Sequence, residues 1–121
     1  MSNTDNFLSL LESLMPPAPE EVARQLADDF RKRRIEKNIT REVCAKISGV
    51  ALANIKRFEQ KGLISLSNLI KLAIALQYTS EIKDIFSKPK YSTMEELTQI
   101  RKNANKKKAH TPTLRHNNEK D

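Results

Sequence analysis

The sequence contains no tryptophan, only two glycines and a single cysteine among its 121 residues. So little glycine leaves few residues for the tight turns of a β-sheet, whereas the abundant Leu, Ile, Ala, Lys, Arg and Glu are good helix formers. The lone thiol of Cys44 cannot form an internal disulfide, which fits a reducing cytoplasm but does not exclude a secreted protein without disulfides. The composition therefore predicts an all-α protein.

Long apolar segments are also missing. The longest apolar run, around residues 69–76, is interrupted by Lys71 and is far shorter than the roughly 20 residues that a membrane span requires. The acidic beginning of the sequence lacks the basic segment that opens a signal peptide. We therefore expect no membrane partner and a cytoplasmic location.

The net charge of +7 is distributed unevenly. Residues 1–30 contain one basic and six acidic residues, whereas residues 31–121 contain 21 basic and nine acidic residues. A concentrated positive field attracts polyanions by counterion release, and nucleic acid is the commonest such partner, ahead of anionic membrane and acidic proteins. Many basic surfaces are only solvated, so the charge indicates a nucleic-acid partner without establishing it.

The chain is predicted to form three parts. Residues 1–18 combine an amphipathic helix with a Pro-rich linker, residues 19–88 form a helical domain, and residues 89–121 form a short helix followed by a basic, largely disordered tail. In the helical domain, helical spacing predicts two apolar stripes and a last short helix at 80–86. The stripes are Val22, Leu26 and Phe30 in the helix that begins near Pro19, and Leu66, Leu69, Ile70, Ala73 and Leu76 in the helix that Ser65 caps.

Residues 40–62 contain the pattern that points to function. Thr40 is a good N-cap for a helix over 41–48, Gly49 ends that helix, and a second helix runs over 51–60. Two short helices joined by so short a turn cross steeply, which is the helix-turn-helix geometry. We expect Val50, Ile55 and Phe58 to point inward and to hold the second helix against the first.

If Val50, Ile55 and Phe58 are buried, the opposite side of the second helix is exposed. It contains Leu52, Ala53, Lys56 and Arg57. An exposed helix face of this kind fits the DNA major groove. Arg57 can reach guanine O6 and N7 with its guanidinium fork, and Lys56 is better placed for a phosphate. The alternative interpretation is a solvated basic helix face without a nucleic-acid partner.

Several of these residues resemble the lambda-repressor-like helix-turn-helix family of the Cro and XRE type, over about residues 20–87. They are Thr40-Arg41-Glu42, Ala45, Gly49-Val50, Ile55 and Arg57-Phe58-Glu59. The segment 55–66 is similar to HipB-type antitoxins and regulators. The resemblance implies a five-helix domain whose third helix, at 51–60, reads the groove while Thr40 and Arg41 meet the DNA backbone. It also implies an ion pair between Arg34 and Glu59.

The sequence departs from the family pattern at two places. Arg41 replaces the usual Gln, which strengthens phosphate attraction at the expense of a hydrogen-bonded bridge to a neighbouring side chain. Ala51 replaces the usual Ser or Thr cap, and Leu52 and Ala53 are apolar where relatives have polar readers. Base readout is therefore expected to use methyl contacts to thymine together with Arg57.

The candidate DNA-binding residues are Thr40, Arg41, Leu52, Ala53, Asn54, Lys56, Arg57 and Lys61. The sequence has no Gly-rich phosphate loop, no paired acid and base, and no metal-ligand spacing, since His110 and His116 lie in the predicted tail. Cys44 lies among apolar neighbours, where a buried thiol is the common outcome. We therefore predict a protein without enzymatic activity, cofactor or metal.

The expected function is that of a repressor which binds a double-stranded DNA operator as a symmetric homodimer, because two half-sites require a two-fold protein. The resemblance further suggests a nucleoid-associated antitoxin that regulates its own operon and pairs with a HipA-like kinase toxin. The first alternative is a stand-alone regulator.

The second alternative is a protein-interaction module that does not bind DNA. An acidic partner would contact the N-terminal helix and the basic cluster of Lys102 and Lys106 to Lys108. The apolar face of the N-terminal helix consists of Phe7, Leu11, Leu14 and Met15. This face either packs back on its own domain or serves as a partner-binding or self-association surface.

Overall fold

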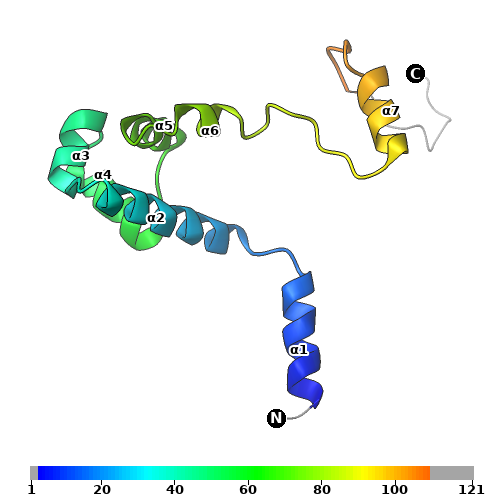
Figure 1. Cartoon of the computed structure of the whole chain (residues 1–121), viewed down its shortest axis with the longest axis horizontal. Helices are drawn as coiled ribbons and strands as arrows, with labels where there is room; N and C mark the ends of the chain where they lie inside the picture. The colour runs from blue at the N-terminus through cyan, green and yellow to red at the C-terminus, as the bar shows by residue number, and fades with distance from the viewer. Residues whose placement is uncertain (1–2, 110–121) are drawn as a thin grey trace, which may run out of the picture. The chain divides into compact units, whose positions relative to one another are not determined.

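The computed structural model describes residues 3–109, and within that range the chain forms seven α-helices and no β-strand (Figure 1). The all-α prediction is confirmed. The helices are α1 (Asn3–Leu14), α2 (Pro19–Glu36), α3 (Arg41–Ser48), α4 (Leu52–Lys61), α5 (Leu66–Ala75), α6 (Thr79–Lys83) and α7 (Met94–Lys102). None of these helices combines the length and the apolar character needed to cross a membrane. The chain divides into two compact units between Asp84 and Ile85.

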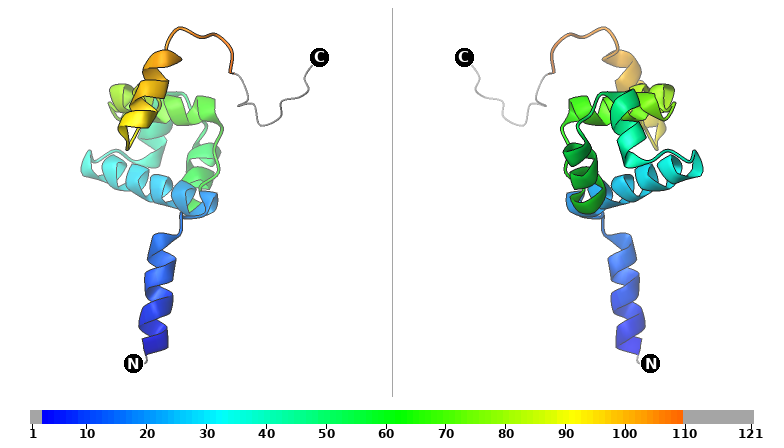
Figure 2. Two further views of the ribbon diagram at one scale, coloured as in Figure 1. Left: turned by 90° about the vertical axis from the view of Figure 1, so that its right-hand side faces the viewer. Right: turned by 90° about the vertical axis from the view of Figure 1, so that its left-hand side faces the viewer.

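The first unit contains a small core formed by α2 to α5. Helix α2 packs against α4, and α3 packs against both α4 and α5, so these four helices surround a shared interior (Figure 2). The rings of Phe30 and Phe58 lie 5.5 Å apart, centroid to centroid, and join α2 to α4. The buried apolar residues are Ala27, Cys44, Val50, Ile55, Phe58, Leu72 and Leu76.

Side-chain caps and left-handed residues set the helix ends, as the sequence predicts. The Thr40 hydroxyl accepts a hydrogen bond from the Val43 N–H at 3.1 Å, and the Ser65 hydroxyl accepts one from the Asn68 N–H at 3.1 Å. Gly49 ends α3 in the left-handed conformation with φ of 78°. Asn38, after α2, is also left-handed with φ of 57°, a conformation that Asn tolerates better than most residues. The caps fix where α3 and α5 begin.

The buried face of α2 differs from the predicted stripe. Val22 and Leu26 are 53% and 46% exposed, while Ala27 and Arg34 are buried. The reason is a close approach of α2 to the end of α4 at Gly62, where a Cβ atom would lie 3.2 Å from the carbonyl carbon of Ala23. Near Gly62 only a small residue such as Ala23 fits between the helices. Farther along α2, Phe30 of the predicted stripe packs against the core and Arg34 is buried.

The predicted stripe of α5 is also only partly correct. Leu76 is buried and Leu69 packs against the core, but Leu66 is 70% exposed and the fully buried residue of this helix is Leu72. The buried side of α5 differs from the predicted one because α5 packs against α3 and α6. These contacts cover Leu72 and leave Leu66 exposed. Helix α6 begins at Thr79 and ends at Lys83, and is thus shorter than the predicted 80–86.

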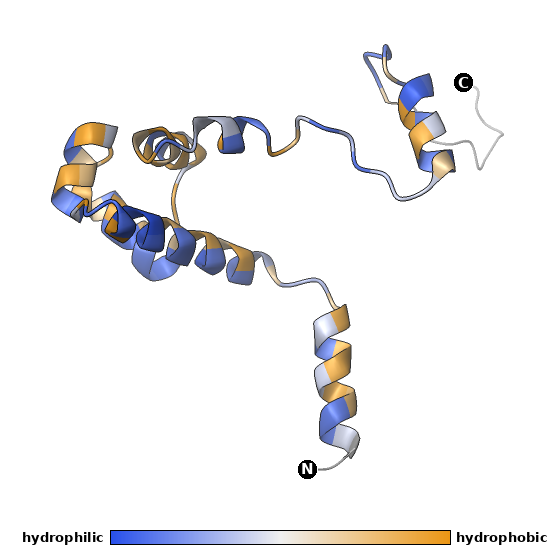
Figure 3. Ribbon diagram, viewed as in Figure 1, coloured by the Kyte–Doolittle hydropathy of each residue, from blue (hydrophilic) through white to orange (hydrophobic). Residues whose placement is uncertain are grey.

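Helix α1 has its hydrophobic residues along one side and its polar residues along the other (Figure 3). Its predicted apolar face is exposed, because Phe7, Leu11, Leu14 and Met15 retain between 40% and 73% of their accessible surface. The helix begins at Asn3 and ends at Leu14, directly before the Pro-rich linker. Within the described residues, this apolar face is not part of the buried core.

The second unit contains α7, whose first turn has reciprocal side-chain caps. The Thr93 hydroxyl accepts a hydrogen bond from the Glu96 N–H, and the Glu96 carboxylate accepts one from the Ser92 N–H at 2.6 Å. Hydrogen bonds from the N–H and the hydroxyl of Ser92 to the carboxylate hold the pKa of Glu96 below its usual value. Lys102 and Lys106 to Lys108 are exposed. Residues 110–121, which include His110, His116 and most of the predicted disordered tail, lie outside the described range.

Cys44 is completely buried, and this burial raises the pKa of its thiol. The thiolate is the reactive species, so we expect the native chain at neutral pH to react with iodoacetamide at least about tenfold more slowly than the urea-unfolded chain. Mass spectrometry of the time course measures both rates. Equal rates in the two states would show that Cys44 is accessible.

Candidate nucleic-acid interface

The candidate interface is built on the turn between α3 and α4. Gly49 takes the left-handed conformation, and the Ser48 hydroxyl accepts a hydrogen bond from the Val50 N–H at 3.0 Å. Val50 is buried, so the turn is anchored in the core directly before α4 begins. Ala51 is the N-cap of α4 and gives no side-chain hydrogen bond to it. The turn that joins α3 to α4 is therefore held by its own hydrogen bond and by the burial of Val50.

Helix α4 has one buried and one exposed side, as predicted. Val50, Ile55 and Phe58 are at most 2% exposed. On the other side, Ala53, Asn54, Lys56, Arg57 and Lys61 are exposed, while Leu52 is half-buried. The only acidic residue of α4, Glu59, has a side chain that is 1% exposed. All the charged side chains on the exposed side of this helix are therefore cationic.

Gln60 lies on this exposed side as well and is absent from the predicted set. Its spacing is the signal that identifies it, because Gln60 follows Arg57 by three residues and Lys56 by four, which are neighbouring positions on a helix surface. An amide at this position can donate to and accept from a base edge. The polar part of the α4 face is thus larger than the sequence analysis proposed.

The structure contains the ion pair between Arg34 and Glu59 and adds a third member. Arg34 donates to both carboxylate oxygens of Glu59, from Nε at 2.8 Å and from Nη2 at 3.0 Å. Arg41 donates from Nε to Oε1 of the same carboxylate at 2.9 Å. The sequence predicted that Arg41 loses the bridge to a neighbouring side chain. This prediction is wrong, because Arg41 forms an ion pair with Glu59.

Thr40 and Arg41 lie together at the start of α3, where the family resemblance places a backbone contact. The Thr40 side chain is exposed even though its hydroxyl caps the helix. The Arg41 side chain is 35% exposed while its Nε is bound to Glu59. Helix α3 thus begins with an exposed hydroxyl and a guanidinium that α4 holds in place.

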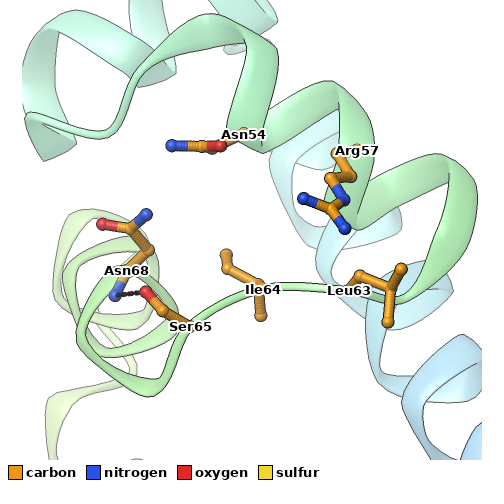
Figure 4. Close-up of a pocket in the computed structure, with 6 residues that line it drawn as sticks. All are labelled: Asn54, Arg57, Leu63, Ile64, Ser65 and Asn68. Carbon is orange, nitrogen blue, oxygen red and sulfur yellow. Dashed lines mark hydrogen bonds between the residues drawn. The ribbon is translucent and has the colours of Figure 1, made fainter.

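An open groove of about 380 Å³ runs between α4 and the start of α5. Asn54 and Arg57 point into it from α4, and Asn68 faces them from the first turn of α5 (Figure 4). Leu63, Ile64 and Ser65 complete its lining. Asn54 and Arg57 are therefore on the flank of α4 that faces α5, whereas Lys56 is on another part of the exposed surface.

Sequence reasoning missed Asn68 and the groove. Asn68 follows the Ser65 cap by three residues, so its backbone N–H is used by the cap and its amide side chain projects from the first turn. The position after a cap is predictable, but its approach to Asn54 depends on the path of residues 62–65 between the helices. That path is set by the left-handed Gly62, with φ of 68°.

No protein-family model matches the chain, and a search of curated proteins finds no match. Within residues 3–109, no group of three or more His, Cys, Asp or Glu side chains is arranged to hold a metal ion.

Proposed function

We propose that the protein is a sequence-specific transcriptional repressor that binds double-stranded DNA through α4. The observation that carries this proposal is the two-sided character of α4, whose apolar side is completely buried and whose exposed side carries three cations and no anion. A helix with its side chains is about 10–12 Å across, and the major groove of B-DNA is about 12 Å wide. Helix α4 therefore has the dimensions and charge of a recognition helix.

Two further features support the assignment of individual contacts. The start of α3 offers Thr40 and Arg41 for the phosphate backbone, and the groove beside α4 offers Asn54, Arg57 and Asn68. Amide and guanidinium groups are the side chains that read adenine and guanine edges and bind phosphates. We propose that Leu52 and Ala53 contact thymine methyl groups, and that Lys56 and Lys61 bind phosphates.

The resemblance of residues 20–87 to lambda-repressor-like domains supports a finer proposal. In it, α2 to α6 correspond to the five helices of that domain, and the protein binds its operator as a homodimer in the nucleoid. On the same resemblance, we propose a HipB-like antitoxin that represses its own operon and binds a HipA-like kinase toxin. Co-purification of a kinase-like protein encoded beside the gene tests this part, and a gene without such a neighbour favours the stand-alone regulator.

A protein-interaction module is the second candidate, and the exposed apolar face of α1 favours it. Phe7, Leu11 and Leu14 are exposed on α1, and Met15 is exposed directly after it. Grouped apolar side chains on a surface mark contact sites for proteins. The two candidates differ in the role of α4. Only the repressor requires that α4 touches DNA.

Selection of duplexes from a randomised DNA pool, followed by mobility-shift titration, tests the proposed function. We expect an enriched sequence that binds at least about 10³-fold more tightly than random duplex. Binding without sequence preference, or no binding, would contradict the repressor and leave the interaction module.

Replacing Arg57 and Lys56 individually by alanine is expected to give different defects. Arg57→Ala should weaken binding to the selected duplex by about 1–3 kcal/mol and relax its base preference, because a bidentate base contact is lost. Lys56→Ala should weaken binding to all duplexes alike and lower the slope of log affinity against log salt by about 0.9. Titration of both variants with selected and random duplexes measures these effects. Unchanged binding of Arg57→Ala to the selected duplex would remove this residue from base readout.

A further inference from the structure

Glu59 binds two arginines at once, although its carboxylate carries a single negative charge. Arg34 approaches both oxygens, at 2.8 and 3.0 Å, and Arg41 approaches Oε1 at 2.9 Å. Arg34 also donates from Nη1 to the backbone oxygen of Ile39 at 2.8 Å. The Arg34 and Glu59 side chains are 7% and 1% exposed, whereas the Arg41 side chain is 35% exposed. The cluster thus has a buried pair and an outer arginine.

The charges of this cluster do not cancel. Arg34 and Glu59 neutralise one another in a buried, bidentate pair, which is the strong form of this interaction. The remaining positive charge belongs to Arg41, which is the first residue of α3. A cation is unfavourable at that end of a helix, because the helix dipole is positive there. The first turn of α3 therefore carries this outer arginine beside a single exposed carboxylate, that of Glu42, and a phosphate would add a second anion at this helix end.

The geometry of Arg41 leaves its terminal nitrogens available. Its hydrogen bond to Glu59 uses Nε, and no other residue of the described range is a hydrogen-bond partner of its Nη1 or Nη2. Arginine binds phosphate through such a planar pair of N–H groups. A guanidinium that is fixed at Nε loses less side-chain entropy when its outer nitrogens bind a second anion.

We propose that Glu59 is a positioning residue for DNA binding, which holds the Arg41 guanidinium in the orientation that meets a backbone phosphate. Glu59 belongs to α4 and lies between the core residue Phe58 and the exposed Gln60. The Glu59 carboxylate therefore holds the phosphate-binding group of α3 at a fixed position relative to the base-reading face of α4. This inference rests on the proposed function and extends it to a residue that DNA does not touch.

A double-mutant cycle with random-sequence duplex DNA of about 30 base pairs tests the inference, since a phosphate contact does not depend on sequence. The variants are Arg41→Ala, Glu59→Gln and their combination, each assayed at a temperature where far-UV circular dichroism shows a folded chain. In the parent background, Arg41→Ala should weaken binding about tenfold and lower the salt slope by about 0.9. In the Glu59→Gln background, the same change should weaken binding less than about threefold, because Arg41 is no longer oriented.

Lys46→Ala is the matched control, since it removes one exposed cation from the last turn of α3. It should change the affinity by less than about twofold in both backgrounds. An equal effect of Arg41→Ala in both backgrounds would overturn the positioning role, and so would parent-like affinity of Arg41→Ala, which would make Arg41 purely structural. Both results leave the proposed function intact as long as the parent prefers its selected duplex. If the parent protein binds no duplex, the proposed function and the positioning role of Glu59 are both overturned.

Arg41→Lys keeps the inference testable if Glu59→Gln does not fold. Lysine retains the charge but lacks the Nε and the planar fork, so it cannot bind Glu59 and a phosphate in the same way. Its affinity should fall to within about threefold of that of Arg41→Ala. Affinity equal to that of the parent would show that only the charge at residue 41 matters, and would overturn the inference.

Discussion

Replacing Phe58 by alanine is expected to lower the free energy of unfolding by about 3–5 kcal/mol. Phe58 is 1% exposed, and its ring packs against Phe30 of α2 across the interface between α2 and α4. The loss combines the transfer free energy of the ring with the cost of the cavity that remains. Urea unfolding followed by far-UV circular dichroism measures it, since the chain has no tryptophan for fluorescence.

Phe86→Ala provides the matched control for this experiment. Phe86 is 95% exposed, so removing the same ring there should change the free energy of unfolding by less than about 0.5 kcal/mol. Similar values for the two variants would mean that Phe58 is not part of the core. The orientation of α4, on which the proposed interface depends, would then be wrong.

Glu59→Ala is expected to lower the free energy of unfolding by about 3–5 kcal/mol, because it leaves the Arg34 guanidinium buried without its counter-ion. Arg41→Ala should cost only about 0–1 kcal/mol, since its side chain is partly solvated and the buried pair remains. Arg34→Ala should fall between them, because Arg41 still neutralises the buried carboxylate of Glu59. The same urea titration ranks the three variants.

Glu42→Ala serves as the control for loss of a carboxylate, because Glu42 is exposed in the first turn of α3. Its removal should cost about 0.3–1 kcal/mol, the value of an acidic residue near a helix N-terminus. If Glu59→Ala were no more destabilising than Glu42→Ala, the cluster of Arg34, Glu59 and Arg41 would contribute nothing to stability. The positioning role of Glu59 would then lose its physical basis.

The ends of α2 and α3, the start of α5 and the sides of α4 were predictable from the sequence because they depend on local chemistry. Thr40 and Ser65 accept hydrogen bonds within their own first turns, and Gly49 and Asn38 have the residue types that tolerate a left-handed conformation. The sides of α4 follow from the spacing of its apolar residues, which is independent of the rest of the fold. No knowledge of distant segments is needed for these features.

Other features depend on contacts between helices and were therefore missed. The buried face of α2 was predicted from Val22 and Leu26, but the approach of α2 to Gly62 selects small residues for that face. The second arginine on Glu59 requires α3 and α4 to cross at a particular angle, which residue spacing does not specify. The groove between α4 and α5 likewise results from the path of residues 62–65.

Gly62 links the end of α4 to the backbone of α2, where a methyl group would lie 3.2–3.3 Å from Ala23 and Arg24. A side chain at this position would be strained by the left-handed backbone, and it would fit only if α4 and α2 moved apart by a few tenths of an ångström. Such a movement would tilt α4, the proposed recognition helix. Such a tilt would redirect every base-facing side chain by a common rotation while leaving their identities unchanged. Under the proposed function, a substitution at Gly62 would therefore alter operator preference although Gly62 is not among the proposed DNA contacts, because it changes the orientation of α4 and not the groups that read the groove.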